Sequence, residues 1–420
     1  MDFDAALRVI DGLSGAGVDL GGADPAYPDF PREEHQRRYA RLSALMEQEG
    51  LEAIVLTQEE PIRYFSGYTS VIWAVGRWLP GAFIATRDPR QAVLVPSAFD
   101  VGAVRGTSWV ETVDGHADPA EIPGKVREHL ARLGITAVGM EWGPGAIVML
   151  PFPVARALAE AVGAGARDAS RLVSAVRMLK SDAERERIRR ATRATVAGYR
   201  AALEGAKAGM TEKELVALCG STAYANGLTA GTRPLFLNCV AGPDRYSLVD
   251  TTASDRALRD GDVVFLDGGG GSDGYMSDII RLIAVGDIGV EKERLASLAQ
   301  DALHAALDAI RPGVKASAVF EAGIGVYEEA GLGAFAGGIA GHGIGLEIWE
   351  RPFIRRHDDP EEDVTIRADM TLCIEPILVP PGDDGAPAGV FVFEQQVAVT
   401  TDGYELLSEG LEPSLWRAPA

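Results

Sequence analysis

Five side chains that can bind metal ions lie between residues 267 and 394, each beside a short apolar or glycine-rich segment. Asp267 ends an apolar run, and Glu375 and Glu394 end similar runs. A lone buried carboxylate is costly, and clustered carboxylates repel one another unless cations neutralise them. A fold that gathers these strand ends therefore requires a counter-charge. In chain order the five residues are Asp267, Asp278, His342, Glu375 and Glu394.

Each of these residues has an ordinary explanation when it is taken alone. An aspartate at a strand end commonly serves a turn, and a histidine between glycines is commonly structural. Together, four carboxylates and one imidazole form an oxygen-rich donor set, without thiolate, that suits two divalent ions. We therefore predict a site for two divalent cations, with Mn²⁺ expected first and Co²⁺, Zn²⁺ or Fe²⁺ as alternatives.

The composition is that of a soluble globular protein with an acidic balance. The chain has 420 residues, enough for two domains, and a formal net charge of −21. Because phosphate binding needs basic patches, this charge argues against a nucleic-acid partner. No apolar run is long enough to span a membrane, and the acidic N-terminus shows no signal-peptide pattern. We expect a small-molecule substrate and no membrane partner.

The cysteines indicate the cellular compartment in which the protein is expected. Cys219, Cys239 and Cys373 are scattered in apolar surroundings and show neither a disulfide framework nor metal-binding spacing. A reducing cytoplasm is therefore the expected location.

Sequence pattern divides the chain into three parts. Residues 1–31 are rich in Gly, Asp and Pro and are expected to form an N-terminal arm, with a short packing helix over 4–13 as the alternative. Residues 32–170 alternate short apolar strands with helices, which favours an α/β domain. Residues 171–420 carry long helices and the strands that bear the candidate ligands. Pattern alone therefore supports an α+β class.

Local signals in the last part set the expected bounds of some elements. Thr211 and Glu214 form a capping-box pattern at the start of one helix. Ser181 precedes a longer helix whose acidic first turn suits the helix dipole. One strand is expected over 275–285, so that Asp278 would lie inside it.

The surroundings of the five candidate ligands resemble the pita-bread metallohydrolases, a family that includes prolidase, aminopeptidase P, methionine aminopeptidase, creatinase and a dimethylsulfoniopropionate lyase. Asp278 lies eleven positions after Asp267, as in the family, and belongs to a Gly-Tyr-x-x-Asp segment. The resemblance extends over about residues 32–408. The other matches are a histidine motif at 341–346 and glutamate motifs at 374–376 and 394–397.

This resemblance implies an architecture. It implies a C-terminal pita-bread catalytic domain preceded by an N-terminal α/β creatinase-like domain, and a homodimer. In the family, the stretch after the motif at 64–68 often lines the pocket of a partner subunit. Trp73 and Arg77 are therefore candidate substrate contacts across a dimer.

The resemblance also implies roles for the five candidate ligands. Asp267 would chelate one ion, while Asp278 and Glu394 would bridge both. His342 and Glu375 would complete the shell of one ion. Glu375 would in addition accept the proton of the attacking water, a role suited to a carboxylate beside that water.

Three positions depart from the pattern of the family's peptidases. Asp250 stands where they carry a histidine seventeen residues before the first aspartate ligand, and Trp349 stands where they carry one seven residues after the ligand histidine. Ile280 replaces a threonine. Ionised aspartate only accepts hydrogen bonds and tryptophan has one donor, so this pair cannot hold a peptide as two histidines do. We expect weak or absent dipeptidase activity.

Two of these positions leave alternatives open. Asp250 could be a turn residue that faces solvent or pairs with Arg245 or Arg281; otherwise it serves as a counter-ion for a cationic substrate nitrogen or as a proton shuttle. Trp349 could be an ordinary core aromatic, or it could stack on a planar or cationic substrate.

The reaction also leaves alternatives open. The first is a metal-dependent hydrolase, Xaa-Pro peptidase-like, acting on a C–N bond of a small amino-acid derivative. The second is a metal-dependent lyase acting on a small cationic substrate, related to the dimethylsulfoniopropionate lyase. The third is a non-catalytic binding module, against which the retention of all five ligands argues.

Overall fold

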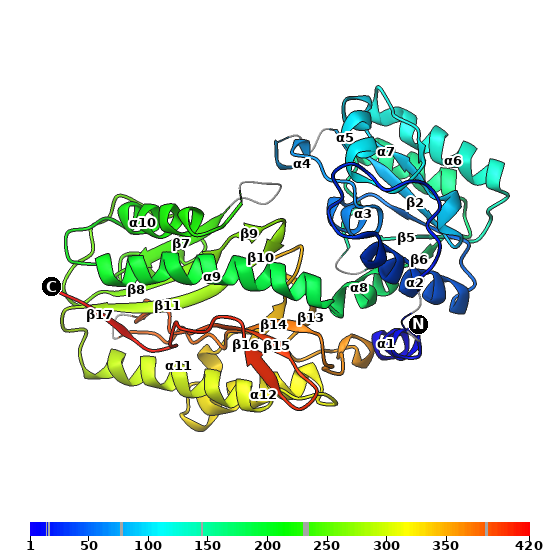
Figure 1. Cartoon of the computed structure of the whole chain (residues 1–420). Helices are drawn as coiled ribbons and strands as arrows, with labels where there is room; N and C mark the ends of the chain where they lie inside the picture. The colour runs from blue at the N-terminus through cyan, green and yellow to red at the C-terminus, as the bar shows by residue number, and fades with distance from the viewer. Residues whose placement is uncertain (14, 16, 76–78, 144–145, 230–234, 383–384) are drawn as a thin grey trace. The chain divides into compact units, whose positions relative to one another are not determined.

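The computed structural model describes most of the chain as two compact units, Met1–Arg177 and Met178–Ala420 (Figure 1). The division lies seven residues after the expected start of the catalytic domain at residue 171. Helix α8 (Ser170–Met178) accounts for this difference, because Tyr64 of the first unit bonds the carbonyl of Val176 within it, at 3.3 Å. The described residues are 1–13, 15, 17–75, 79–143, 146–229, 235–382 and 385–420.

The first unit is built on one six-stranded mixed sheet. Its strands are β1 (Ala53–Leu56), β2 (Ala82–Thr86), β3 (Val93–Val95), β4 (Thr112–Val113), β5 (Val138–Met140) and β6 (Arg167–Asp168). They follow the order β4-β3-β2-β1-β5-β6, with β1 antiparallel to β2 and parallel to β5. Short apolar runs form the central strands, as the sequence predicts for a covered sheet.

Helices cover this sheet and bury apolar side chains against it. Ile122 and Val126 of one helix and Leu158 of another share a core cluster with Val55 and Ile84 of the sheet. The alternation of strands and helices confirms the expected α/β domain. The helices are α2 (Arg32–Gln48), α3 (Glu59–Ser66), α4 (Ile72–Val75), α5 (Val101–Thr107), α6 (Ile122–Leu133) and α7 (Phe152–Val162), besides α8.

The first residues form the short helix that was the alternative to a loose arm. Helix α1 (Phe3–Asp11) starts at Asp2, whose side chain accepts the backbone N–H of Ala5 at 2.6 Å. Phe3 and Leu7 are buried, and this helix packs against α2 of the first unit.

The second unit contains two larger sheets and a short hairpin. The larger sheets have the orders β17-β11-β8-β7 and β13-β12-β14-β15-β16, and β9 pairs with β10. The two larger sheets meet where the N–H of Glu394 donates to the carbonyl of Ile280 at 3.3 Å. The strands are β7 (Phe236–Ala241), β8 (Val263–Gly269), β9 (Gly271–Ser272), β10 (Tyr275–Met276), β11 (Ile279–Val285), β12 (Gly341–Gly343), β13 (Glu350–Phe353), β14 (Thr371–Ile374), β15 (Gln395–Val399), β16 (Tyr404–Leu406) and β17 (Trp416–Ala418).

Two helix pairs accompany these sheets (Figure 1). Helices α9 (Asp182–Gly205) and α10 (Glu212–Ala225) lie over the sheet of β7, β8 and β11, and α11 (Val290–Asp308) and α12 (Ala316–Glu329) lie along the other sheet. Paired helices on largely antiparallel sheets, in which only β17 of the described strands pairs in parallel, confirm the expected pita-bread domain. No described helix is both long and apolar enough to cross a membrane.

Capping interactions fix where α9 and α10 begin. Thr211 and Glu214 form the predicted capping box, with each side chain bonding the other residue's backbone N–H. Ser181 and Glu184 form a second capping box, at a position where the sequence predicts only a favourable dipole interaction.

The prediction of one continuous strand over 275–285 is wrong, because the structure has two strands there, β10 and β11. The chain leaves the ladder at Ser277, whose N–H donates to the carbonyl of Gly270 at 3.0 Å and whose hydroxyl accepts the N–H of Gly270 at 3.3 Å. The first bond continues the hairpin, whereas the hydroxyl takes the place of a ladder acceptor; β10 has ended here, and β11 begins only at Ile279. Asp278 therefore lies at the break, where its side chain can leave the sheet edge.

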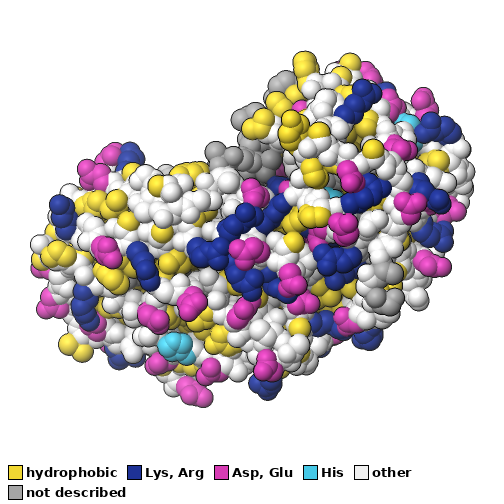
Figure 2. Space-filling view, viewed as in Figure 1, with side chains coloured by type: hydrophobic (Ala, Val, Ile, Leu, Met, Phe, Trp, Pro, Cys, Tyr) yellow, Lys and Arg dark blue, Asp and Glu magenta, His cyan; other side chains and the backbone are white. Residues whose placement is uncertain are grey.

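Basic side chains gather over the N-terminal half of α9 on the face shown in Figure 2. Arg190 pairs with Asp273 at 2.9 Å, and Arg193 pairs with Glu186 at 3.0 Å. These pairs neutralise the positive charge locally, so the strip is an ion-paired, solvated face of the helix.

Candidate metal centre

The five predicted ligands lie together in the second unit, on strands from both of its larger sheets. Asp267 pairs with Ile280 across β8 and β11, and Asp278 lies two residues before Ile280. Asp278 therefore precedes β11 beside the strand position that pairs with Asp267. Carboxylate oxygens of Asp267, Asp278 and Glu394 lie within 4.8 Å of one another. The structure therefore gathers carboxylates that are far apart in the sequence.

The other sheet supplies the histidine and the glutamates. His342 pairs with Cys373 across β12 and β14, and Glu375 follows two residues after Cys373. Glu394 directly precedes β15, where Gln395 pairs with Ile374. These side chains consequently share the face that meets the two aspartates.

Glycines beside the ligands let the strands approach closely. Gly268 has a φ of 133°, and a Cβ there would lie 2.1 Å from the carbonyl oxygen of Phe236. Gly341 has a φ of 151°, and a Cβ there would lie 2.2 Å from the carbonyl oxygen of Cys373. Any side chain at these positions would force the ligand-bearing strands apart.

The His342 ring is oriented as a metal ligand requires. Its Nδ1 lies 3.0 Å from the carbonyl oxygen of Gly343, which fixes Nδ1 as the N–H donor. Its Nε2 faces Glu375 Oε1 at 3.3 Å and Asp278 Oδ2 at 3.9 Å. A backbone carbonyl that holds one ring nitrogen leaves the other free to bind a metal.

Several buried polar atoms of the cluster have no hydrogen-bond partner among the described residues. Both carboxylate oxygens of Glu394 are in this state, although the residue is fully buried. A buried charge without donors is strongly unfavourable unless a ligand meets it. The residues present therefore fit a pair of divalent cations. The unpartnered atoms are Asp278 Oδ1, His342 Nε2, Glu375 Oε1 and both Glu394 oxygens.

Burial and mutual repulsion disfavour charge on these carboxyls. Burial raises the pKa of Asp278 to about 7, with His342 opposing the shift and Glu375 adding to it. Burial also raises the pKa of Asp267 well above its usual range, and the charges of Asp278 and Glu375 add to this shift. Bound cations would reverse this balance, because a metal charge favours the ionised carboxylate.

The cluster is open on one side. Asp278, His342 and Glu394 are buried, whereas Asp267 and Glu375 are partly exposed. A substrate would therefore approach past Asp267 and Glu375, where Glu375 can take up a proton.

Asp250 lies near the partly exposed Asp267. It is exposed, and its charge contributes to the raised pKa of Asp267, so the two carboxylates lie near each other. The cations considered as its partners are engaged elsewhere: Arg245 pairs with Glu212 at 3.2 Å, and Arg281 bonds backbone carbonyls. Among the described residues, Asp250 has no ion pair or hydrogen bond.

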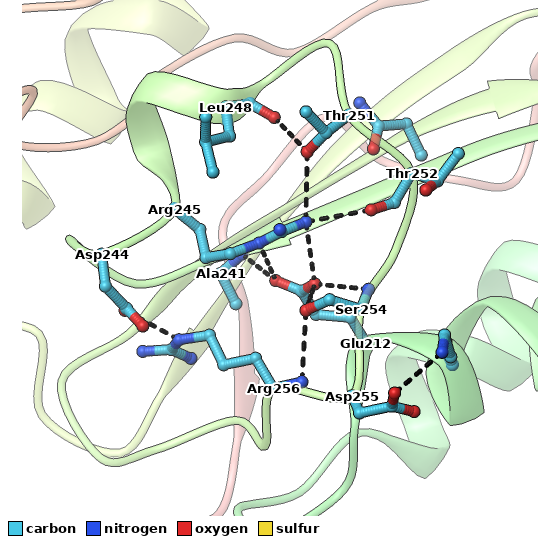
Figure 3. A network of polar contacts seen from close by, with 12 residues as sticks. Glu212, Ala241, Asp244, Arg245, Leu248, Thr251, Thr252, Ser254, Asp255 and Arg256 are labelled. Atoms are coloured by element: carbon cyan, nitrogen blue, oxygen red, sulfur yellow. Dashed lines mark hydrogen bonds and ion pairs between the residues drawn. The ribbon is translucent and has the colours of Figure 1, made fainter.

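A buried carboxylate fixes the loop that carries Asp250 (Figure 3). Glu212, at the start of α10, accepts the N–H of Ala241 at 2.9 Å and the N–H and hydroxyl of Ser254 at 2.8 and 2.7 Å. Arg245 binds the same carboxylate from within the loop. The loop is thus tied at both ends to one residue, which holds Asp250 in place.

Asn238 is a site residue that the sequence analysis missed. It pairs with Asp267 across β7 and β8, so both side chains share a face. Its Nδ2 donates to the carbonyl of Val249, while its buried Oδ1 has no partner in the described chain. The available signal was an amide within the apolar run 235–240.

Trp349 stands at the site and is not a core residue. Its ring stacks on His342 with centroids 5.0 Å apart and planes at 30°. The residue is 55% exposed, so the core alternative is wrong. Its exposed surface lies beside the cluster.

Cys373 was also missed as a site residue. Its Sγ and ligand atoms of His342 and Glu394 lie within 4.8 Å of one another. The expectation of purely apolar surroundings is therefore wrong for this cysteine. Its position two residues before Glu375 on one strand was the available signal.

The two candidates for contacts across a dimer lie in the first unit. Trp73 packs edge-to-face on Tyr68, with ring centroids 4.6 Å apart. Arg77 lies outside the described residues. Their contact with substrate stays a prediction.

Comparison with known proteins identifies the family. The profile of metallopeptidase family M24 matches residues 186–401, about half of the chain. The chain belongs to metallopeptidase family M24. The profile of the creatinase/prolidase N-terminal domain matches residues 38–179. Membership supports a metal-dependent hydrolase, and the expected family and enzyme class are confirmed.

Relatives of this M24 protein are described as dipeptidases. "Probable dipeptidase PepE" of Mycobacterium bovis is 29% identical over 381 residues, covering 89% of this chain and 94% of the relative. The Xaa-Pro dipeptidase of Pyrococcus horikoshii is 27% identical over 234 residues, covering 56% of this chain and 63% of the relative.

Solved structures agree with the fold. The dipeptidase PepE from Mycobacterium ulcerans superposes with a TM-score of 0.78 at 26% identity, covering 93% of this chain and all (100%) of its own. The Xaa-Pro dipeptidase from Bacillus anthracis gives 0.77 at 24% identity, covering 91% and 99%. Both similarities extend over both units.

Proposed function

We propose that this M24 metallopeptidase hydrolyses a C–N bond of a small amino-acid derivative with a cationic nitrogen and is a poor ordinary dipeptidase. The observation that carries this proposal is the exposed, unpartnered carboxylate of Asp250 beside Asp267. The resemblance places a histidine there in peptidases. An extra carboxylate at an acidic centre is unfavourable unless a cation meets it.

The metal centre of the proposal consists of the five predicted ligands. When bound, two divalent cations would neutralise their carboxylates, acidify a water and polarise the substrate. Glu375 would accept the proton of the attacking water at its partly exposed carboxylate and deliver it to the leaving nitrogen. Mn²⁺, Co²⁺, Zn²⁺ and Fe²⁺ all suit these donors. The ligands are Asp267, Asp278, His342, Glu375 and Glu394.

Three groups would recognise the cationic nitrogen. Asp250 and the free Oδ1 of Asn238 can only accept hydrogen bonds, which suits an ammonium or guanidinium group. Trp349 would add an aromatic face worth about 0.5–2 kcal/mol. A scissile amide carbonyl instead needs donors, which none of these acceptors supplies. This contrast is the reason to expect weak dipeptidase activity.

Substitution of Asp250 tests the substrate class. Asp250→Asn and Asp250→His are compared with wild type on Gly-Pro and on a panel of cationic and neutral amino-acid derivatives. We expect both variants to lose about tenfold or more in kcat/KM on cationic substrates only, which corresponds to about 1.4 kcal/mol. Asp255→Asn is the matched control, since this exposed aspartate of the same loop pairs with Lys213. The proposal fails if both variants keep the wild-type preference.

Elimination is the second candidate reaction, because Glu375 could also remove a proton from carbon. Product analysis in ¹⁸O-labelled water separates the two. Label incorporated into the product supports hydrolysis, whereas an unsaturated product without label supports a lyase.

The proposal also includes a cellular location, an assembly and a contact across that assembly. The protein would act as a cytoplasmic homodimer in which Trp73 contacts substrate bound by the partner subunit. Sedimentation of wild type measures the assembly, and Trp73→Ala should then raise KM without changing metal content.

A further inference from the structure

We propose that the thiolate of Cys373 is a sixth protein ligand of the metal centre. The site would then combine sulfur, nitrogen and oxygen donors, in contrast to the sulfur-free set predicted from the sequence. This inference rests on the proposed metal binding and extends it to a residue outside the five expected ligands.

The strand register places Cys373 at the centre of the ligand-bearing sheet. It pairs with His342 on one side and with Gln396 on the other. Cys373 also lies two residues before Glu375, so both side chains point to the same face, toward the cluster.

The distances suit a shared ion. Cys373 Sγ lies within 4.8 Å of ligand atoms of both His342 and Glu394. Sulfur and nitrogen donors bind zinc at about 2.3 and 2.0–2.1 Å, so two donors of one ion lie no more than about 4.4 Å apart. The three donors therefore need only small shifts to meet one cation.

A second observation points to a ligand at the same place. His342 Nε2 and both Glu394 oxygens are fully buried and have no hydrogen-bond partner within the described chain. A thiol that only donated a weak hydrogen bond to Glu394 would leave His342 Nε2 unsatisfied. One cation shared with Cys373 satisfies all three side chains.

Such a donor changes which metal the site prefers. Thiolate is a soft ligand that selects zinc and other later transition metals, whereas carboxylate-rich sites suit manganese. With Cys373 as a ligand, Zn²⁺, Co²⁺ or Fe²⁺ should therefore displace Mn²⁺ as the preferred ion.

Cobalt provides a direct readout that does not depend on activity. Metal-depleted protein is reconstituted with Co²⁺, and its absorption spectrum is compared with that of Cys373→Ser. We expect a thiolate-to-cobalt charge-transfer band in the near ultraviolet for wild type and its loss in Cys373→Ser. Zinc affinity should fall at least as far as on loss of an outer-shell partner, about 10–100-fold, and manganese affinity should change less.

Cys239 supplies the matched control. It is as buried as Cys373 but belongs to the apolar core between α9, α10 and the sheet of β7 and β8. Cys239→Ala should keep the charge-transfer band. A band that persists in Cys373→Ser and disappears in Cys239→Ala would assign the sulfur to the wrong cysteine and overturn the proposal.

X-ray absorption at the cobalt edge of the wild-type protein covers the case in which Cys373→Ser does not fold. A sulfur scatterer in the metal shell supports the inference. Cobalt bound by nitrogen and oxygen alone overturns thiolate ligation while leaving the proposed metal centre intact. A wild-type protein that binds no divalent cobalt overturns the metal centre itself and this inference with it.

Discussion

Glu394 shows how single residues prepare this site. Buried Arg281 donates to the backbone carbonyl of Glu394 at 2.6 Å, while the carboxylate of Glu394 has no hydrogen bond to the described residues. Arg281 also donates to the carbonyls of Ile280 at 2.7 Å and Glu412 at 3.1 Å, and burial lowers the pKa of its guanidinium to about 10. The guanidinium thus holds the backbone and leaves the carboxylate for a ligand.

Asp278→Asn tests the cost of buried charge in metal-free protein. The folded-state pKa of Asp278 is about 7, above the ordinary value of about 3.9, so folding favours its protonated form. The stability that it contributes is complete at low pH and is lost as pH rises from about 4 to about 7. In chelator, the advantage of Asp278→Asn over wild type should therefore grow across that window and then level off.

Urea unfolding at stepped pH measures this advantage. Exposed Asp358→Asn is the control and should show no such trend. With saturating divalent metal, wild type should instead be more stable than Asp278→Asn, because asparagine is a poorer metal ligand than a carboxylate. An advantage that does not vary with pH would contradict the assignment.

Glu375→Gln tests the proton acceptor. Glutamine keeps the shape of the side chain but cannot take up a proton, so kcat should fall about 10²–10⁴-fold. Circular dichroism should show an unchanged fold, and metal analysis reports any loss of ligation. Near-normal turnover in this variant would exclude the role.

At the scale of elements, apolar runs in the sequence predict the bounds of some strands but not of others. The bounds of β1 and β2 follow directly from their buried sequences. β12 is Gly341–Gly343, which has almost no side-chain pattern, so the sequence predicted its histidine as a ligand but no strand there. Asn238 could not be placed at the site from sequence, because its position opposite Asp267 depends on strand register, whereas Cys373 could have been placed from its two-residue spacing to Glu375.

Glu212→Gln tests the element that carries Asp250. Glutamine is neutral, so Arg245 would lose the charged partner of its largely buried ion pair. The variant should therefore destabilise the protein by about 3 kcal/mol. It should also raise KM for cationic substrates more than it lowers kcat. Glu291→Gln, in an exposed pair with Arg294, should change stability by less than about 1 kcal/mol. Equal effects of both variants, measured by thermal unfolding, would refute the anchoring role.

At the scale of the whole molecule, only the second unit contains the ligands. They come from both of its larger sheets, so a bound cation would tie those sheets together. The first unit has its own sheet and core and holds no predicted ligand. Metal binding should therefore stabilise the two units unequally.

Hydrogen exchange on the intact chain measures this difference. At a metal concentration about 100 times Kd, the second unit should gain about 2.7 kcal/mol. Amide hydrogens of β8, β11, β14 and β15 that exchange only when the second unit unfolds should therefore exchange more slowly. Strands β1, β2 and β5 should change little, and equal protection of both units would contradict a site confined to the second.

Gly268 and Gly341 have a consequence for anyone who would retarget this enzyme in the laboratory. No larger residue fits at either position, so the strands around the metals offer almost no room for variation. Useful diversity would have to come from connecting segments, above all 242–256 and 344–349, which carry Asp250 and Trp349. A library restricted to those segments should yield more active clones than one spread over the strands.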